Sequence, residues 1–211
     1  MHVGSSNQSG IRRDQNALLS ALKDDDWDLL APHLEAREFA RHEAIFIQGD
    51  DVGSSVFPCG RMVVSLRVDD VQGVSCEVCT IGREGAVGGI ISHGRAPAFT
   101  SAVVETNGGG FAVPTARLEK VKAASPSFDR LFARYADCLL AQIMQSAACN
   151  ALHGVEQRIA RWLLTFQDRF GGDVIPVTQE DLAAALGVGR PYASRQLKAL
   201  KQQGLIDLRR G

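Results

Sequence analysis

Cys76 and Cys79 form a Cys-x-x-Cys pair, a spacing that in other proteins holds zinc or carries out thiol–disulfide exchange. Both lie in a segment with β-strand character, where residues i and i+3 point to opposite faces. A bulge or a turn would be needed to bring both thiols to one metal ion. The sequence therefore favours two packed thiols over a metal or redox centre.

The other candidates for metal or redox chemistry stand alone. Cys138 and Cys149 are isolated, and Cys59 beside Gly60 is the candidate for a single-thiol redox sensor. No pair at metal-ligand spacing occurs among the histidines, which are His2, His33, His42, His93 and His153. A haem would need an axial ligand, for which His93 is the loose candidate. A cupin-type metalloenzyme would need His-x-His, a nearby Glu and a later His. That set is absent, so we expect no enzyme, no metal and no catalytic residue, and a cupin-like β-roll metalloenzyme stays the alternative from another class.

The most specific signal is a cluster of cations on one short helix. The cations are Arg190, Arg195, Lys198 and Lys201. No Asp or Glu lies between Arg190 and Lys201. The opposite side is apolar at spacings of three and four residues, through Ala193, Leu197 and Leu200. A cationic helix face with an apolar back suits a DNA groove, because the cations meet phosphates and Arg can donate two hydrogen bonds to guanine. The alternative is a solvated basic helix face.

The stretch before these cations predicts a helix-turn-helix, which favours DNA binding over that alternative. Thr178 is a good N-cap, and the Asp181 side chain can accept a reciprocal hydrogen bond from its backbone, as in a capping box. Gly187 permits a sharp turn, Val188 can fill the corner between the helices, and Pro191 is tolerated in a first turn.

Charge is divided unevenly along the 211 residues. Residues 154–211 hold nine Lys and Arg against six Asp and Glu, whereas the rest holds fourteen against eighteen. A basic C-terminal part on an acidic body is typical of a DNA-binding module attached to another domain. The chain shows no apolar leader, no run long enough to span a membrane and no secreted-type cysteine framework, so we expect a cytoplasmic protein with reduced thiols.

Three further parts precede the helix-turn-helix. Residues 1–15 read as a disordered N-terminus. Residues 16–125 read as two short helices, at 16–22 and 25–34, followed from 37 to about 113 by short β-like runs between glycine turns. That spacing predicts an antiparallel jelly-roll or β-roll. Asp24 to Asp26 can cap the second short helix.

A long helix is expected at 126–152, after Ser125-Pro126 breaks the chain. Its apolar side consists of Phe128, Leu131, Phe132, Tyr135, Leu139 and Ile143, widened by Leu140 and Met144. This is more apolar surface than one β-roll face needs, so the sequence predicts a parallel two-helix dimer seam. Packing wholly within its own domain is the alternative. A hinge is expected near 150–154. Residues 153–211 then contain, besides the helix-turn-helix, a helix at 155–170, a short strand VIPV at 174–177 and the first strand of a wing from 205. A wing needs a second strand, so it is incomplete unless the chain continues.

This order of parts resembles the Crp/Fnr family of bacterial transcription regulators over residues 15–211. The motifs that carry the resemblance are IFIQGDDVGSSVFPCGRMVVSL, EVCTIGREGAVGG, GVEQRIARWLLTF and the helix-turn-helix. The resemblance implies an α+β fold: a cyclic-nucleotide-binding-like β-roll that senses a signal, a long dimerisation helix and a C-terminal winged helix-turn-helix. It also implies a homodimer on a palindromic DNA operator, with RNA polymerase as a further partner. The iron–sulfur branch carries an N-terminal cysteine cluster, which this chain lacks before Cys59.

Carried over by position, Arg190 matches the guanine-reading Arg of the cyclic-AMP receptor branch. Ser194 and Arg195 match the Ser-Arg pair of the oxygen-sensor branch. Tyr192 and Lys198 are expected to assist or to position phosphates. Pro191 stands where both branches commonly place a base-reading Glu, so the resemblance implies a different half-site.

The effector pocket departs from the cyclic-nucleotide pattern. Gly88-Gly89 stands where such binders have Gly-Glu, and Thr100-Ser101 stands where they have Arg-Ser or Arg-Thr. Glu84 and Arg95 are nearby but at other spacings. A cyclic phosphate buried without a cation is strongly disfavoured, so we expect an unknown small-molecule effector rather than cyclic AMP. A cyclic-nucleotide-responsive regulator with a rebuilt pocket remains the alternative.

Overall fold

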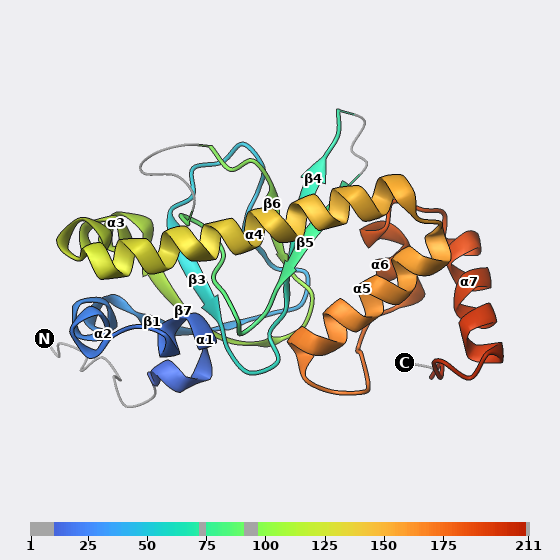
Figure 1. Ribbon diagram of the computed structural model, residues 1–211, viewed down its shortest axis with the longest axis horizontal. Coiled ribbons are helices and arrows are strands. Elements are labelled where there is room, and N and C mark those ends of the chain that lie inside the picture. The colour runs from blue at the N-terminus through green and yellow to red at the C-terminus, as the bar shows by residue number, and fades with distance from the viewer. Residues whose placement is uncertain (1–10, 72–74, 91–96, 210–211) are drawn as a thin grey trace, which may run out of the picture.

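The computed structural model describes residues 11–71, 75–90 and 97–209 (Figure 1). A β-roll forms the middle of the molecule, and a long helix, α4, runs past it from end to end. The N-terminal helices gather near one end of α4, and the C-terminal helices lie at the other. Within the described ranges, no helix has the length and apolar character needed to cross a bilayer.

The β-roll consists of two antiparallel sheets. One has the order β1 (Glu35–Phe39), β7 (Gly108–Pro114), β3 (Ser54–Pro58). The other has the order β2 (Ala44–Phe46), β6 (Ser101–Val104), β4 (Val64–Asp69), β5 (Ser75–Ile81). The expected antiparallel β-roll is therefore confirmed, and its two sheets stay open rather than closing into one barrel.

Two details of the β-roll differ from the sequence expectation. The β-like run GAVGGIISHG starts at Gly85, and its described residues, 85–90, form no strand. They contribute a single β-bridge, between Val56 and Val87. Successive glycines with positive φ, at Gly88 and Gly89, turn the backbone away from the ladder there. A ten-residue helix that the sequence analysis did not identify, α3 (Thr115–Ala124), follows β7 directly.

Short helices close the N-terminal end of the roll. A 3-10 turn, η1 (Arg13–Gln15), leads into α1 (Ala17–Ser20), and α2 (Asp24–Leu30) continues as the 3-10 turn η2 (Ala31–His33). The expected Asp cap of α2 is wrong, because Lys23 occupies the N-cap position and makes no side-chain cap. Asp26 lies instead in the first turn, buried, and accepts hydrogen bonds from the hydroxyls of Ser125 and Ser127. This contact ties α2 to the start of α4.

The long helix α4 spans Pro126–Leu152 and begins at a Ser125 cap whose hydroxyl accepts from the Phe128 N–H. Its apolar side packs on the β-roll of its own chain. Phe128 and Phe132 stack with their ring centres 4.4 Å apart, and Phe132 meets Phe57 of β3 edge-on. Leu139 is buried in the same core.

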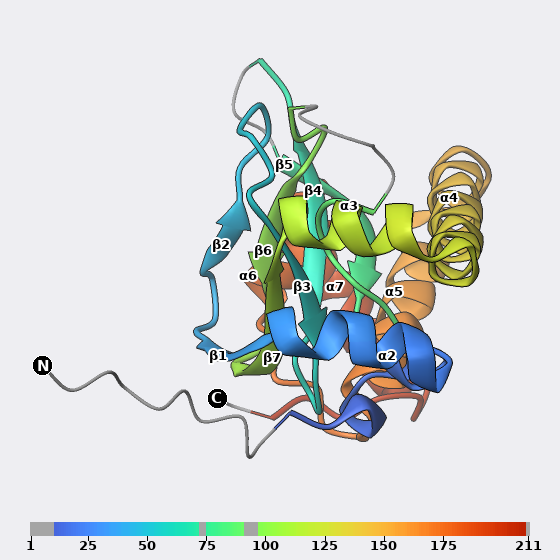
Figure 2. The ribbon, with the colours of Figure 1, turned by 90° about the vertical axis from the view of Figure 1, so that its left-hand side faces the viewer.

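The expected dimer seam therefore needs correction. Phe128, Phe132 and Leu139 are almost fully buried within one chain, and the Tyr135 hydroxyl donates to the Ala86 carbonyl at 2.9 Å. Leu131 and Ile143 are partly buried against the same core. Phe128, Phe132 and Leu139 therefore have no surface left for a partner helix, and the seam as predicted is wrong for these three residues. Figure 2, which views α4 nearly end-on, shows the helix outside the β-roll with its far side uncovered.

After a break at His153 and Gly154, three helices form a second core. They are α5 (Val155–Phe170), α6 (Gln179–Ala185) and α7 (Arg190–Gln202). The chain leaves α5 through Gly171, whose left-handed backbone donates its N–H to the Gln167 carbonyl. Two strand expectations fail: neither 174–177 nor 205–209 is a strand. The Leu205 N–H donates to the Leu200 carbonyl, and the Val177 N–H donates to the Ile175 carbonyl. Both bonds are local and do not belong to a strand ladder.

Candidate nucleic-acid interface

A reciprocal capping box starts α6. The Asp181 N–H donates to the Thr178 hydroxyl at 3.1 Å, and the Thr178 N–H donates to the Asp181 carboxylate at 2.9 Å. These bonds satisfy donors that have no partner within the helix. Burial alone would raise the pKa of Asp181, but hydrogen bonding to Thr178 and the nearby Arg41 guanidinium outweigh it and lower the pKa below its ordinary value. The expected cap is confirmed and is ionised at neutral pH.

The turn between α6 and α7 has the expected chemistry. Gly187 adopts a φ of 62°, in the left-handed region, and its N–H bonds to the Ala184 carbonyl. Val188 packs against the C-terminal core at the corner between the helices. Gly189 then caps α7 with no side-chain bond, and Pro191 sits in the first turn.

The two sides of α7 separate as predicted. Ala193, Leu197 and Leu200 are buried in the core formed with α5 and α6. Arg190, Arg195 and Lys198 are exposed on the other side. Burial of the apolar stripe fixes the rotation of the helix, so the cations have to face outward.

Contacts on the exposed side hold these groups in place. The Arg195 guanidinium lies 5.3 Å from the ring centre of Tyr192, itself partly exposed. The Ser194 hydroxyl donates to the Gln179 side chain at 2.6 Å. Arg190 pairs only loosely with Glu180 of α6, at 3.8 Å between two solvent-exposed side chains, a pair that contributes little. Lys201 is engaged by Asp207 at 2.8 Å. The sequence thus identified a surface on which three cations, Arg190, Arg195 and Lys198, are exposed to solvent.

Contacts that the sequence did not reveal dock this helical domain on the β-roll. Arg41, in the turn between β1 and β2, pairs with the capping carboxylate of Asp181 at 2.5 Å, and both side chains are largely buried. On β5, the Glu77 carboxylate accepts from the indole N–H of Trp162 at 2.8 Å. These partners lie 140 and 85 residues apart in sequence, and no local pattern links them.

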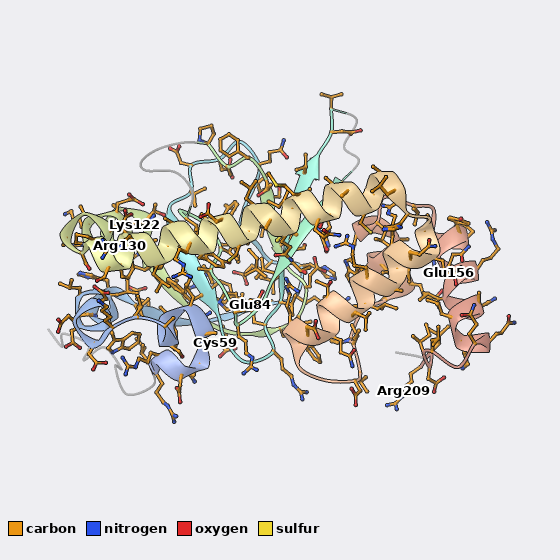
Figure 3. The ribbon with its side chains drawn as sticks, in the orientation of Figure 1. Cys59, Glu84, Lys122, Arg130, Glu156 and Arg209 are labelled. Carbon is orange, nitrogen blue, oxygen red and sulfur yellow. The ribbon has the colours of Figure 1, made fainter. Side chains whose placement is uncertain are left out.

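A second docking contact involves one residue of the predicted effector pocket. Glu84 pairs with Arg169 of α5 at 3.1 Å and accepts from the Gly82 N–H. Arg169 also donates to the Thr80 carbonyl at the end of β5, at 2.7 Å. Figure 3 shows Glu84 between the β-roll and the C-terminal end of α5. This carboxylate therefore joins the two domains.

The other predicted pocket residues have separate partners. The Ser101 hydroxyl is buried, donates to the Asp69 carboxylate and accepts from the Gln48 N–H, each at 3.0 Å. Thr100 is half-buried beside it. Gly88 and Gly89 lie against β3, and Arg95 lies outside the described residues. Among the described residues, Gly88, Gly89 and Ser101 thus each have their own neighbours, and the effector pocket stays a prediction.

The paired cysteines also have separate neighbours. The Cys76 thiol points at the Ala185 carbonyl of α6, 3.9 Å away, and the Cys79 thiol donates to the Gln142 side chain of α4 at 3.2 Å. No cluster of three or more ligating side chains suitable for a metal ion occurs in the part of the chain that is described. Burial raises the pKa of Cys79 to about 12 and that of Cys59 to about 11. Such thiols stay protonated at neutral pH, and a protonated thiol is a poor nucleophile.

Comparisons with known proteins agree with this arrangement of domains. Residues 157–211 match the family model of the Crp-like helix-turn-helix domain. No curated protein sequence matches the chain significantly.

Solved structures match most of the chain. CLP of Xanthomonas campestris, a c-di-GMP responsive global regulator, is 19% identical, with a TM-score of 0.72 over 89% of this chain and 96% of CLP. FixK2 of Bradyrhizobium japonicum is 16% identical, with a TM-score of 0.72 over 84% of this chain and 89% of its own. TTHB099, a CRP family transcriptional regulator of Thermus thermophilus, is 19% identical, with a TM-score of 0.68 over 82% and 88% of the two chains.

The chain therefore combines a β-roll, a long helix and a helix-turn-helix domain. The fold is that of the Crp/Fnr type, and the C-terminal part of this chain is a Crp-like helix-turn-helix domain.

Proposed function

We propose that this chain is a sequence-specific, double-stranded DNA-binding transcription regulator of the Crp/Fnr type. The observation that carries the proposal is the exposed cationic side of α7, held outward by a buried apolar stripe and by the capped α6. In this arrangement Arg190 and Arg195 read bases in the major groove. Tyr192, Ser194 and Lys198 contact phosphates or support the two arginines.

Support for a homodimer comes from the outer side of α4. An exposed row at heptad spacing consists of Ala133, Asp137, Leu140, Met144, Ala147 and Ala151. Leu140 and Met144 are 49% and 60% exposed, which is unusual for large apolar residues on a helix that already packs a core. Small and apolar side chains at this spacing suit a parallel two-helix seam. Two recognition helices related by a two-fold axis would read a palindrome whose half-sites lie about 34 Å apart.

We propose that the effector is not cyclic AMP. A Cβ added at Gly89 would lie 2.7 Å from the Ser55 hydroxyl, and one at Gly88 would lie 2.7 Å from the Ser54 carbonyl. Both glycines also have positive φ. A Glu at position 89, which would be needed to bind a ribose hydroxyl, would therefore have to displace the Ser55 side chain and adopt a strained backbone. Ser101 faces the Asp69 carboxylate, which would repel a cyclic phosphate.

The test is selection of bound sequences from random duplex DNA by the purified protein, with and without cyclic AMP. We expect one palindrome, recovered equally in both conditions. Recovery only with cyclic AMP would support the cyclic-nucleotide-responsive alternative with a rebuilt pocket. Failure to enrich any sequence, by a protein shown to be folded and dimeric, would contradict the proposal.

A further inference from the structure

A small cavity lies where the β-roll meets the helical domain. It is lined by β5, the second half of α4, α5 and the end of α6, and its volume is about 20 Å³. Its polar lining includes Glu77, Gln142, Ser146, Arg158 and Arg161. None of the residues predicted for an effector pocket lines it. Both domains and the long helix thus contribute walls to one small cavity.

Three polar side-chain atoms around this cavity have no hydrogen-bond partner among the residues that the structure describes. They are Glu77 Oε2, Arg158 Nε and Arg161 Nε, and each is inaccessible to solvent. Buried polar groups in folded proteins are nearly always hydrogen-bonded, because desolvation without a partner is costly. Three such atoms on one small cavity indicate that something polar occupies it.

The charge of the lining selects the kind of occupant. Arg158 donates to the Leu186 carbonyl at 2.7 Å and Arg161 to the Ser146 hydroxyl at 3.2 Å, both uncharged acceptors. Neither guanidinium has an ion pair among residues 11–71, 75–90 and 97–209. Two guanidinium groups, each with a buried Nε atom, line the cavity with one acidic side chain, Glu77, so positive charge exceeds negative charge there. The cavity is therefore electropositive and lined by donors, which suits an anion.

Size limits the occupant further. A cavity needs roughly 10–15 Å³ to hold one water, so this one holds one or two atoms of that size. Nucleotides and drug-sized ligands require pockets of several hundred Å³. A halide ion fits, and a nucleotide does not.

We propose that this cavity is a binding site for a single small monovalent anion, such as chloride, held between Arg158 and Arg161. The anion links α5 to the wall formed by β5 and α4, and it stabilises the docked position of the helical domain on the β-roll. This proposal does not depend on DNA binding, because the site is complete in the protein alone.

The chain allows a direct optical test. Its two tryptophans are Trp27, near the N-terminus, and Trp162, which lines the cavity. In a Trp27→Phe protein, Trp162 is the sole indole reporter. Sodium chloride is titrated against sodium gluconate at constant ionic strength, because gluconate is too large to enter. We expect a saturable change in Trp162 emission.

Two variants made in that background separate the site from general salt effects. Arg161→Gln should raise the chloride midpoint by about tenfold or more, since it removes a charge-assisted donor. Arg130→Gln, on the exposed surface of α4 (Figure 3), should leave the midpoint unchanged. A linear response, or the same midpoint in both variants, overturns the proposal.

Crystals of the unmutated protein provide a measurement that does not depend on the tryptophan substitution. After a bromide soak, we expect an anomalous difference peak between the guanidinium groups of Arg158 and Arg161. The proposal is overturned if the cavity holds water and no bromide. It is also overturned if a bromide peak appears but the solution response does not saturate.

Discussion

Glu77 gives the sharpest test of how the β-roll and the helical domain are joined. Burial and, to a smaller extent, repulsion by Glu105 raise its pKa from the ordinary 4.5 to about 8. The Trp162 hydrogen bond and the charges of Arg67 and Arg169 lower the pKa but do not offset burial. Glu77, Arg158 and Arg161 all line the small cavity between the β-roll and the helical domain. The folded protein therefore holds Glu77 protonated at a pH where the unfolded chain ionises it.

This difference makes stability depend on pH in a defined direction. An acid whose pKa is raised by folding contributes its full stability below the unfolded value of 4.5 and loses it as pH rises through about 8. Between these values each pH unit changes the free energy of unfolding by about 1.4 kcal/mol. From pH 5 to pH 8 the loss therefore reaches at most about 4 kcal/mol, on the order of 10 °C in melting temperature for a chain of this size.

The assay compares the unmutated protein with Glu77→Gln by urea denaturation between pH 5 and pH 8. Gln keeps the acceptor for the Trp162 N–H and cannot ionise, so we expect the variant to be the more stable protein at pH 8 and about equal at pH 5. Glu156→Gln, exposed in the first turn of α5, is the matched control and should follow the unmutated protein. A difference between the unmutated protein and Glu77→Gln that stays constant across this range would refute the reasoning.

Three further predictions concern the cap, the dimer and the effector region. Thr178→Ala should cost about 1 kcal/mol of stability through loss of the capping box, measured by urea denaturation; an unchanged midpoint contradicts it. Leu140→Glu with Met144→Glu should yield monomers in sedimentation velocity, whereas Gln145→Glu, also exposed on α4, should not; a dimeric double variant rules out this seam. Gly89→Glu should lower stability by about 1–3 kcal/mol without conferring cyclic AMP binding by calorimetry, because its φ is 62°; a stable variant that binds cyclic AMP would overturn our view of the pocket.

The sequence predicted the strongly periodic and well-capped segments closely. The capping box of Thr178, the turn at Gly187 and the two sides of α7 follow from local chemistry, and the structure contains all three. The order of β-roll, long helix and helix-turn-helix also followed from glycine spacing and helical periodicity. Such features are encoded by residues close together in the chain, so they can be identified without tertiary information.

Features that depend on distant partners could not be predicted in the same way. The apolar stripe of α4 showed that one side is buried, but periodicity cannot distinguish the chain's own β-roll from a second chain as the partner. Phe128 and Phe132 pack inward, whereas Leu140 and Met144 stay outside. The segment VIPV has the residues of a strand but finds no partner backbone in the described structure.

The docking contacts lay beyond sequence reasoning for a similar reason. Arg41 and Asp181 meet across 140 residues, and Glu77 looks like any charged residue of a strand until α5 covers it. The cavity beside Glu77 arises only when four elements come together. The elements of the helix-turn-helix could therefore be predicted from the sequence, and its attachment to the β-roll could not.

The measurement that tests the central claim most directly is the affinity of the unmutated protein and of Arg195→Ala for the selected palindrome and for unrelated duplex DNA. A lost bidentate contact to guanine costs about 1–3 kcal/mol per half-site, so we predict at least about a tenfold loss on the palindrome. We expect a much smaller change on unrelated DNA. The Lys201 ammonium pairs with Asp207, so the Lys201→Ala variant should retain most of the specific affinity. An Arg195→Ala protein that keeps both its affinity and its preference for the palindrome would contradict the assignment of α7 as the recognition helix.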